Sequence, residues 1–165
     1  MPNCCSNRLK VRMGKNTKIA LKQFNEFGLT YDNVVKTETL FGIEFPCPQE
    51  LRDTQSSPGT TDVKLKKLYL ENTQKYGYPD WYKWSVAHWG VKWEARDIDQ
   101  EGDSENIVFN FNTAWGAPEK WLEEVSKKYP KLEFHNEFSI EGGMGCGILS
   151  YQNGEGNLDI VKNKG

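Results

Sequence analysis

Segments in which apolar and polar residues alternate constrain the fold of this chain most. The clearest one covers residues 7–13. Its apolar residues are Leu9, Val11 and Met13, and its basic residues are Arg8, Lys10 and Arg12. Because successive side chains of a strand point to opposite faces, this alternation predicts a half-buried strand. The same pattern predicts strands over 91–97, 106–115 and 132–140, each with one polar face.

Helix signals lie between these segments. Asn16 or Thr17 can cap a helix that runs to Phe27, with Gly28 as its stop. A later helix is expected between Pro118 and Pro130, and its apolar residues are Trp121, Leu122, Val125 and Tyr129. Asn153-Gly154 predicts the turn of a terminal hairpin over 145–151 and 157–161.

Residues 37–90 are expected to form a helical insertion between the first helix and the second strand. Residues 37–61 look irregular, with a turn at 56–59. A helix over about 61–75 follows, and its candidate buried residues are Val63, Leu65, Leu68 and Tyr69. Pro79 suits the start of a shorter helix that Gly90 ends, on which Trp81, Trp84 and His88 share a face. The acidic residues 99–105 are interpreted as a loop.

The order strand, helix, insertion, strand, strand, helix, strand predicts an α+β fold. It is the split βαβ plan of the ferredoxin-like fold, here an antiparallel sheet with a helical insertion and a C-terminal hairpin. We expect a single domain over 1–165, because the length suits one hydrophobic core. Helices would cover one face of the sheet and leave the other face polar.

Charge and composition narrow the function classes. The 21 basic and 23 acidic residues nearly balance, so binding to nucleic acid stays an alternative but is not favoured. Residues 1–25 nevertheless contain six basic residues and no acidic one, which makes this stretch the better candidate for phosphate contacts. No apolar run approaches the length of a membrane span, so we expect a cytoplasmic protein without membrane contact.

The four cysteines are Cys4, Cys5, Cys47 and Cys146, without a C-x-x-C motif. We expect reduced thiols, neither bridged nor bound to metal. Four of the six tryptophans fall within residues 81–93. Large aromatic side chains anchor a core or a ligand pocket, and we expect Trp89, Trp93 and Trp115 to be mainly structural.

Several short motifs resemble one family. They are Met1-Pro2-Asn3-Cys4-Cys5-Ser6-Asn7, Pro46-Cys47-Pro48-Gln49-Glu50-Leu51, Trp89-Gly90-Val91-Lys92-Trp93, Thr113-Ala114-Trp115-Gly116-Ala117-Pro118 and Ser126-Lys127-Lys128-Tyr129-Pro130. In this order they resemble the Api92-like proteins of phages, prophages and plasmids, which have a ferredoxin-like domain of the YubB type. The resemblance implies that fold, a mobile-element origin and therefore the cytosol of a host cell. Cys4, Cys47 and Gly116 stand where the family usually has Trp, Met and Ser.

The sequence contains no complete catalytic or metal-binding set. His88 and His135 are the available general bases, and a structural role is the better interpretation of each. Glu133, His135 and Glu137 alternate along one strand, so their side chains lie in a row and do not converge on a metal ion. We expect no metal and no cofactor.

These observations lead to a binding hypothesis. We expect a non-enzymatic protein, acting in counter-defence, that sequesters a nucleotide signal or docks on a host defence protein. The candidate ligand-binding residues are Asn7, Arg8, Lys10, Arg12, Trp84, His88, Trp89, Lys92 and Arg96. One alternative is a nucleotide-processing enzyme with His88 or His135 as general base, and another is a nucleic-acid accessory protein. Association into a homo-oligomer also stays open.

Overall fold

A computed structural model describes residues 3–54 and 62–160. Its centre is a six-stranded sheet in the order β2-β3-β1-β4-β5-β6, in which every neighbouring pair is antiparallel. The strands are β1 (Cys4–Met13), β2 (Arg96–Gly102), β3 (Asn106–Ala114), β4 (Leu132–Ile140), β5 (Gly145–Gln152) and β6 (Glu155–Ile160). The first strand therefore lies between β3 and β4, as the split βαβ plan requires.

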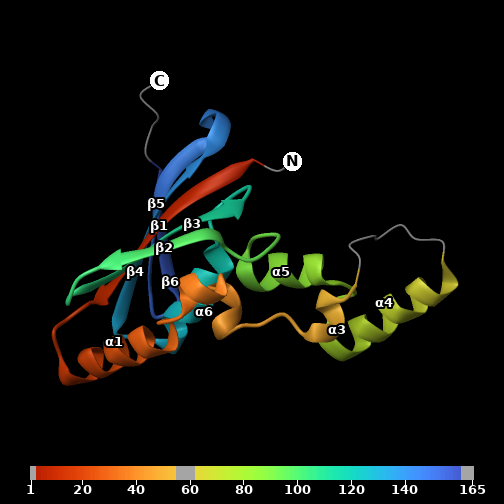
Figure 1. Cartoon of the computed structure of the whole chain (residues 1–165), viewed down its shortest axis with the longest axis horizontal. Coiled ribbons are helices and arrows are strands. Elements are labelled where there is room, and N and C mark those ends of the chain that lie inside the picture. The colour runs from red at the N-terminus through yellow and green to blue at the C-terminus, as the bar shows by residue number, and fades with distance from the viewer. Residues whose placement is uncertain (1–2, 55–61, 161–165) are drawn as a thin grey trace.

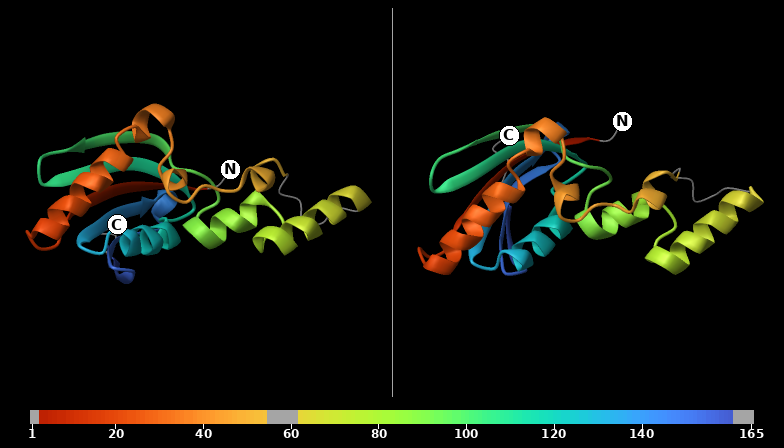
Figure 2. Two further views of the ribbon diagram at one scale, coloured as in Figure 1. Left: turned by 90° about the horizontal axis from the view of Figure 1, so that it is seen from below. Right: turned by 60° about the horizontal axis from the view of Figure 1, so that its bottom comes forward.

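Two helices, α1 (Lys18–Thr30) and α6 (Glu119–Lys128), pack on one face of the sheet (Figures 1 and 2). The insertion between α1 and β2 holds α2 (Val34–Thr37), the 3-10 helix η1 (Phe41–Ile43), α3 (Gln49–Arg52), α4 (Val63–Tyr76) and α5 (Trp81–Trp89). A second 3-10 helix, η2 (Glu141–Gly143), joins β4 to β5. The expected α+β ferredoxin-like fold with a helical insertion and a terminal hairpin is confirmed.

The core lies between the sheet and these two helices. Leu9 and Val11 of β1 are fully buried, as the alternation predicts. The ring of Phe27 in α1 stacks on Tyr31 at 4.3 Å and meets Phe134 of β4 edge-on at 5.7 Å. The four residues expected to be buried by the later helix, Trp121, Leu122, Val125 and Tyr129, are all buried. Removing one of the large side chains would cost about 3–5 kcal/mol of folding free energy.

Of the two predicted ends of α1, the start is observed and the stop is not. Thr17 caps the helix, because its hydroxyl oxygen accepts a hydrogen bond from the Ala20 amide at 3.1 Å. The expected stop at Gly28 is wrong, since the helix continues to Thr30. A glycine inside a helix costs only about 1 kcal/mol, which the packing of Phe27 and Tyr31 on either side outweighs.

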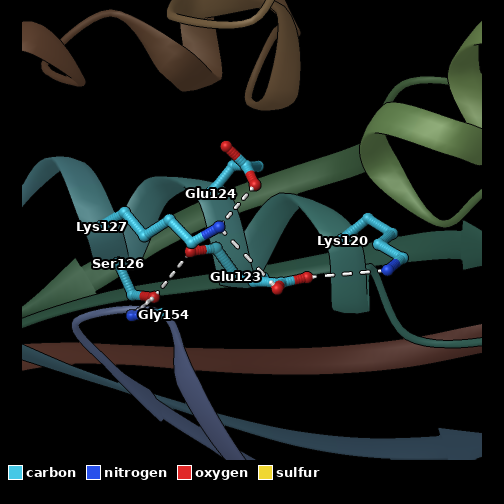
Figure 3. A network of polar contacts seen from close by, with 6 residues as sticks. All are labelled: Lys120, Glu123, Glu124, Ser126, Lys127 and Gly154. Carbon is cyan, nitrogen blue, oxygen red and sulfur yellow. Dashed lines mark hydrogen bonds and ion pairs between the residues drawn. The ribbon is translucent and has the colours of Figure 1, made fainter.

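The terminal hairpin forms where the sequence predicts it. Asn153 and Gly154 have φ angles of 51° and 79°, which suit a two-residue turn between antiparallel strands. The amide of Gly154 donates to the Ser126 hydroxyl at 3.0 Å, and that hydroxyl donates to the Glu123 carbonyl at 2.9 Å (Figure 3). These two hydrogen bonds attach the turn to α6. The ion pairs of Lys120 and Lys127 beside them are exposed, so they add little stability.

The second strand lies later in the sequence than expected. Residues 91–95 are not a strand, and β2 instead takes up most of the acidic stretch that we interpreted as a loop. The actual turn is at 103–105, where the Asp103 carboxylate accepts hydrogen bonds from the amides of Glu105 and Asn106. Because β2 is the sheet edge and only Ile98 is buried in it, its charged side chains stay in solvent.

The expected burial of α4 is also wrong. The helix forms, but Val63 and Leu68 are 79% and 39% exposed, and Asn72 is its only buried residue within the described part of the chain. Figure 1 shows the reason, since α4 projects away from the sheet at the far end of the insertion. The expected turn at 56–59 and the expected helix start at Thr61 lie outside the described residues.

Candidate functional site

The face of the sheet opposite α1 and α6 carries a groove made of three connected hollows. An edge hollow of about 230 Å³ is lined by Cys4, Trp93 and Arg96 among others. A middle hollow of about 430 Å³ shares Asp97 and Asn112 with it. A third hollow of about 210 Å³ shares Arg8 and Glu137 with the middle one and also contains Lys10, Arg12 and His135. We call this surface the open-face groove.

The three basic residues of β1 line the groove, but two of them already have partners. Arg12 binds Glu133 of β4, with 3.0 Å between Nε and Oε2, as cross-strand pairing predicts. Arg8 lies opposite Glu137 but forms its ion pair with Glu101 of β2. Among the described residues no ion pair involves Lys10. The basic strand therefore offers less unpaired charge than its sequence indicates.

Asn7 lies on the other face of β1 and belongs to the core. It is only 4% exposed. Its side-chain amide donates to the Thr113 hydroxyl at 2.9 Å and the Cys5 carbonyl at 3.1 Å, and its oxygen accepts from Asn136 at 3.0 Å. These contacts give the Asn7 side chain a structural role, although the residue also borders the middle hollow next to Arg8.

The expected residues of α5 do not join the basic strand. Trp84 and Trp89 are buried, and the Trp89 indole donates to the Phe45 carbonyl at 2.9 Å. The imidazole of His88 is exposed and stacks on Trp84 at 4.3 Å, and its partial burial lowers its pKa. None of the described residues that line the open-face groove comes from α5. The structure thus separates Trp84, His88 and Trp89 from the other candidates.

Lys92 and Arg96 both contact the ring of Trp93, which lines the edge hollow together with Arg96. The guanidinium of Arg96 lies 4.1 Å from the Trp93 ring centroid. The Lys92 ammonium lies 4.8 Å from Trp93, 5.6 Å from Trp115 and 5.7 Å from Tyr82. Such cation–π contacts fix both cations beside rings that reach solvent. We call these five residues the aromatic–basic cluster.

Trp115 is the residue that sequence reasoning missed. We expected it to be mainly structural, but its side chain is 50% exposed and therefore lies largely outside the core. The strand ends at Ala114, and Trp115 takes a left-handed conformation with φ of 68°, so the alternation no longer sets its direction. Its amide donates to the Asn3 carbonyl at 2.8 Å. A left-handed conformation costs a residue other than glycine about 1–2 kcal/mol.

His135 has two polar neighbours on the open face. Its Nδ1 lies 3.0 Å from the Ser150 hydroxyl and its Nε2 lies 3.2 Å from Glu133 Oε2. Burial would raise the pKa of Glu133, but hydrogen bonds from His135 and Arg12 outweigh it and lower that pKa. The Ser150 hydroxyl, the His135 imidazole and the Glu133 carboxylate therefore form a chain of hydrogen-bond neighbours. The carboxylate is also paired with Arg12.

The described residues contain no group of three or more side chains suited to a metal ion. All four cysteines are described, and none is in a disulfide. Burial raises the pKa of Cys5 and of Cys47, the latter to about 11. Within the described ranges, no helix has both the length and the apolar composition needed to cross a membrane.

Comparisons with known proteins agree with the fold. Residues 88–164 match a family model described as the ferredoxin-like domain in Api92-like protein. The crystal structure of protein Api92 from Yersinia pseudotuberculosis superposes with a TM-score of 0.51 at 7% identity, covering 100% of this chain and 99% of that one. The family match confirms the resemblance to Api92-like proteins, and the structural likeness at this identity concerns the fold alone. No curated protein matches the sequence.

Proposed function

We propose that this chain, whose residues 88–164 are the ferredoxin-like domain of an Api92-like protein, is a non-enzymatic binding protein that takes a nucleotide into the open-face groove. The single observation that carries the proposal is the aromatic–basic cluster. It combines exposed ring surface with two cations, and two of its members, Trp93 and Arg96, line the edge hollow of the groove. A nucleotide needs both, since its base stacks and its phosphates are anionic.

The exposed ring of Trp115 suits the base. A solvent-facing indole can stack a nucleobase of any identity, because every base has a π face. The side-chain amides of Asn112 and Asn110 lie along the next part of the groove and can hydrogen-bond base edges. Asn112 is already positioned, since its Nδ2 donates to Asp97 Oδ2 at 3.0 Å.

Lys92 and Arg96 suit the phosphates. Arginine presents a planar fork of donors that fits phosphate oxygens. Arg96 of β2 lies opposite Asn112 of β3, and Asn112 lies opposite Ser6 of β1. A ligand that extends along this line reaches Arg8 and Lys10 at the third hollow. We therefore expect the strongest phosphate contacts at the cluster and weaker ones at β1, where Arg8 and Arg12 have carboxylate partners.

The acidic residues of the groove favour a small ligand over a long nucleic acid. Asp97, Glu101, Glu133 and Glu137 all border the open face. They would repel an extended phosphate backbone, whereas one or two phosphates at the cluster avoid them. For a protein of a mobile element, we propose that the bound nucleotide is a signal of host defence and that the chain sequesters it. Docking on a defence protein is the alternative.

Calorimetric titration with a panel of mononucleotides and cyclic dinucleotides tests the proposal. Trp115→Ala and Arg96→Gln should each weaken binding about tenfold, since stacking and charge-assisted hydrogen bonds are worth about 1–3 kcal/mol each. Lys67→Gln on the exposed helix α4 is the matched control and should bind as the parent chain does. Undiminished binding by both cluster variants would refute the site.

A second candidate function is a nucleotide-processing enzyme, favoured by the contact between His135 and Ser150. If Nδ1 accepts the Ser150 proton, Nε2–H donates to Glu133, and the imidazole is held as a general base. Product analysis after incubation with the same nucleotide panel separates the two functions. Multiple turnovers that Ser150→Ala or His135→Gln abolishes would assign the chain to the enzymes.

A further inference from the structure

The insertion contains a cavity that is distinct from the open-face groove. Its volume is about 440 Å³, within the range of small-molecule sites. It lies between the segment that follows α2, the α3 helix, α5 and residues 93–94. Trp93 is the one residue that it shares with the edge hollow of the groove. We call it the insertion pocket.

The walls of the insertion pocket are aromatic on one side. Trp81 and Trp89 of α5 line it, together with Trp93. Trp93 already stacks with Arg96, and Trp89 is almost fully buried, so the half-buried Trp81 offers the most accessible ring. Tryptophan is the aromatic side chain that attracts cations most strongly.

Among the described residues that line the pocket, the charged groups are two carboxylates and one guanidinium. Glu94 is held in place, because its oxygens accept hydrogen bonds from the amides of Phe41 at 2.7 Å and Gly42 at 2.9 Å. Glu38 is exposed at the end of α2 in a left-handed conformation with φ of 53°. Arg52 is the opposing charge and is exposed.

The Cys47 thiol adds no charge to this balance. Burial raises its pKa to about 11, so it stays neutral at physiological pH. The described lining of the pocket therefore has one more negative than positive side chain, beside indole rings. Both features favour a cation over an anion, opposite to the preference expected of the groove.

We propose that the insertion pocket is a second binding site, for a small organic cation that carries an ammonium group on an apolar body. The ammonium lies against Trp81 and near Glu38, and Arg52 opposes it. This site can be tested apart from the nucleotide proposal, because Trp93 is the one lining residue that it shares with the edge hollow and its ligand has the opposite charge.

Choline and its neutral isostere 3,3-dimethyl-1-butanol are suitable probes. Each is titrated into the full chain labelled with ¹⁵N at the tryptophan indoles, and the Trp81 resonance is followed. Choline should bind about fivefold more tightly than the isostere, since the two differ only in charge. Equal affinities would overturn the proposal, as would an unchanged Trp81 resonance.

Charge variants give the sharper test because their expected effects have opposite signs. Glu38→Gln should weaken choline binding about fivefold, whereas Arg52→Gln should strengthen it by a similar factor. Both residues are exposed, so both variants should fold. Glu71→Gln on α4 is the matched control and should change nothing. Equal affinities in the Glu38 and Arg52 variants would overturn the assignment of the pocket.

Discussion

The guanidinium carbon of Arg96 lies 4.1 Å from the centroid of the Trp93 ring, at the point where the insertion returns to the sheet. Lys92 approaches the same ring from 4.8 Å. Two cations are thus held in place before any ligand arrives, which lowers the entropy cost of binding an anion. This arrangement makes the cluster, more than the basic strand, the centre of the candidate site.

Trp115→Ala should weaken nucleotide binding while leaving the stability of the fold nearly unchanged. The ring is half exposed, so we expect the free energy of unfolding to change by less than about 1 kcal/mol. Trp121→Ala is the contrast, because Trp121 is fully buried and its loss should cost about 3–5 kcal/mol. Urea unfolding of the two variants checks both values. A large loss of stability in the Trp115 variant would show that the ring is structural after all.

Asn7→Ala should act mainly by destabilising the fold, because the Asn7 side chain is hydrogen-bonded inside the core. The substitution would remove the acceptor of the buried Asn136 amide, whereas the Thr113 hydroxyl would keep its hydrogen bond to the Gly116 carbonyl. A buried polar group that loses its hydrogen bond costs about 1–3 kcal/mol, so we expect a loss of that size. Thermal or urea unfolding measures it. Unchanged stability together with lost nucleotide binding would return Asn7 to the ligand-binding set.

Stability should fall at alkaline pH because of two tyrosines. The hydroxyls of Tyr31 and Tyr129 donate to Glu44 at 2.7 and 2.8 Å. Burial, with the Glu44 charge adding to it, raises the pKa of both tyrosines above their usual 10. The folded chain then binds more protons than the unfolded chain above about pH 10, so the free energy of unfolding decreases as pH rises.

The Tyr31→Phe and Tyr129→Phe variants provide the control for this pH dependence. Each should be less stable than the parent at neutral pH and should lose less stability between about pH 9 and 11. Urea unfolding across that range makes the comparison. Identical pH slopes in the parent chain and both variants would contradict the expected shifts.

The four thiols should react at different rates. Cys5 and Cys47 are buried, and burial raises the pKa of each, whereas Cys4 and Cys146 are partly exposed. Because the thiolate is the reactive form, a disulfide reagent at pH 8 should modify two thiols quickly and two only slowly. Equal rates for all four, or stoichiometric zinc in the purified protein, would contradict this account of the cysteines.

Much of the fold follows from local signals. The alternation of Leu9 and Val11 identifies β1, and Asn153-Gly154 identifies the final turn. The acidic β2 could not be recognised this way, because an edge strand needs only one inward residue, here Ile98. The exposure of Leu68 on α4 depends on where the helix is placed, which its own apolar spacing does not reveal.

The candidate site is only partly visible in the sequence. The outward direction of Arg8, Lys10 and Arg12 follows from strand periodicity, but their pairing with Glu101 and Glu133 depends on tertiary contacts. The aromatic–basic cluster joins residues from α5, the segment before β2 and the end of β3. Lys92 and Arg96 are candidates from the sequence, whereas the local signal for Trp115 is its place before Gly116, where a strand gives way to a turn.

The most direct test of the nucleotide-binding account is a titration followed by the indole N–H resonances of the six tryptophans. A nucleotide bound in the open-face groove should shift the signals of Trp93 and Trp115, whose rings lie at the cluster. It should leave Trp121 unchanged, because that ring is fully buried in the core. If no nucleotide of the panel shifts the Trp115 signal at millimolar concentration, the chain does not bind nucleotides at this site.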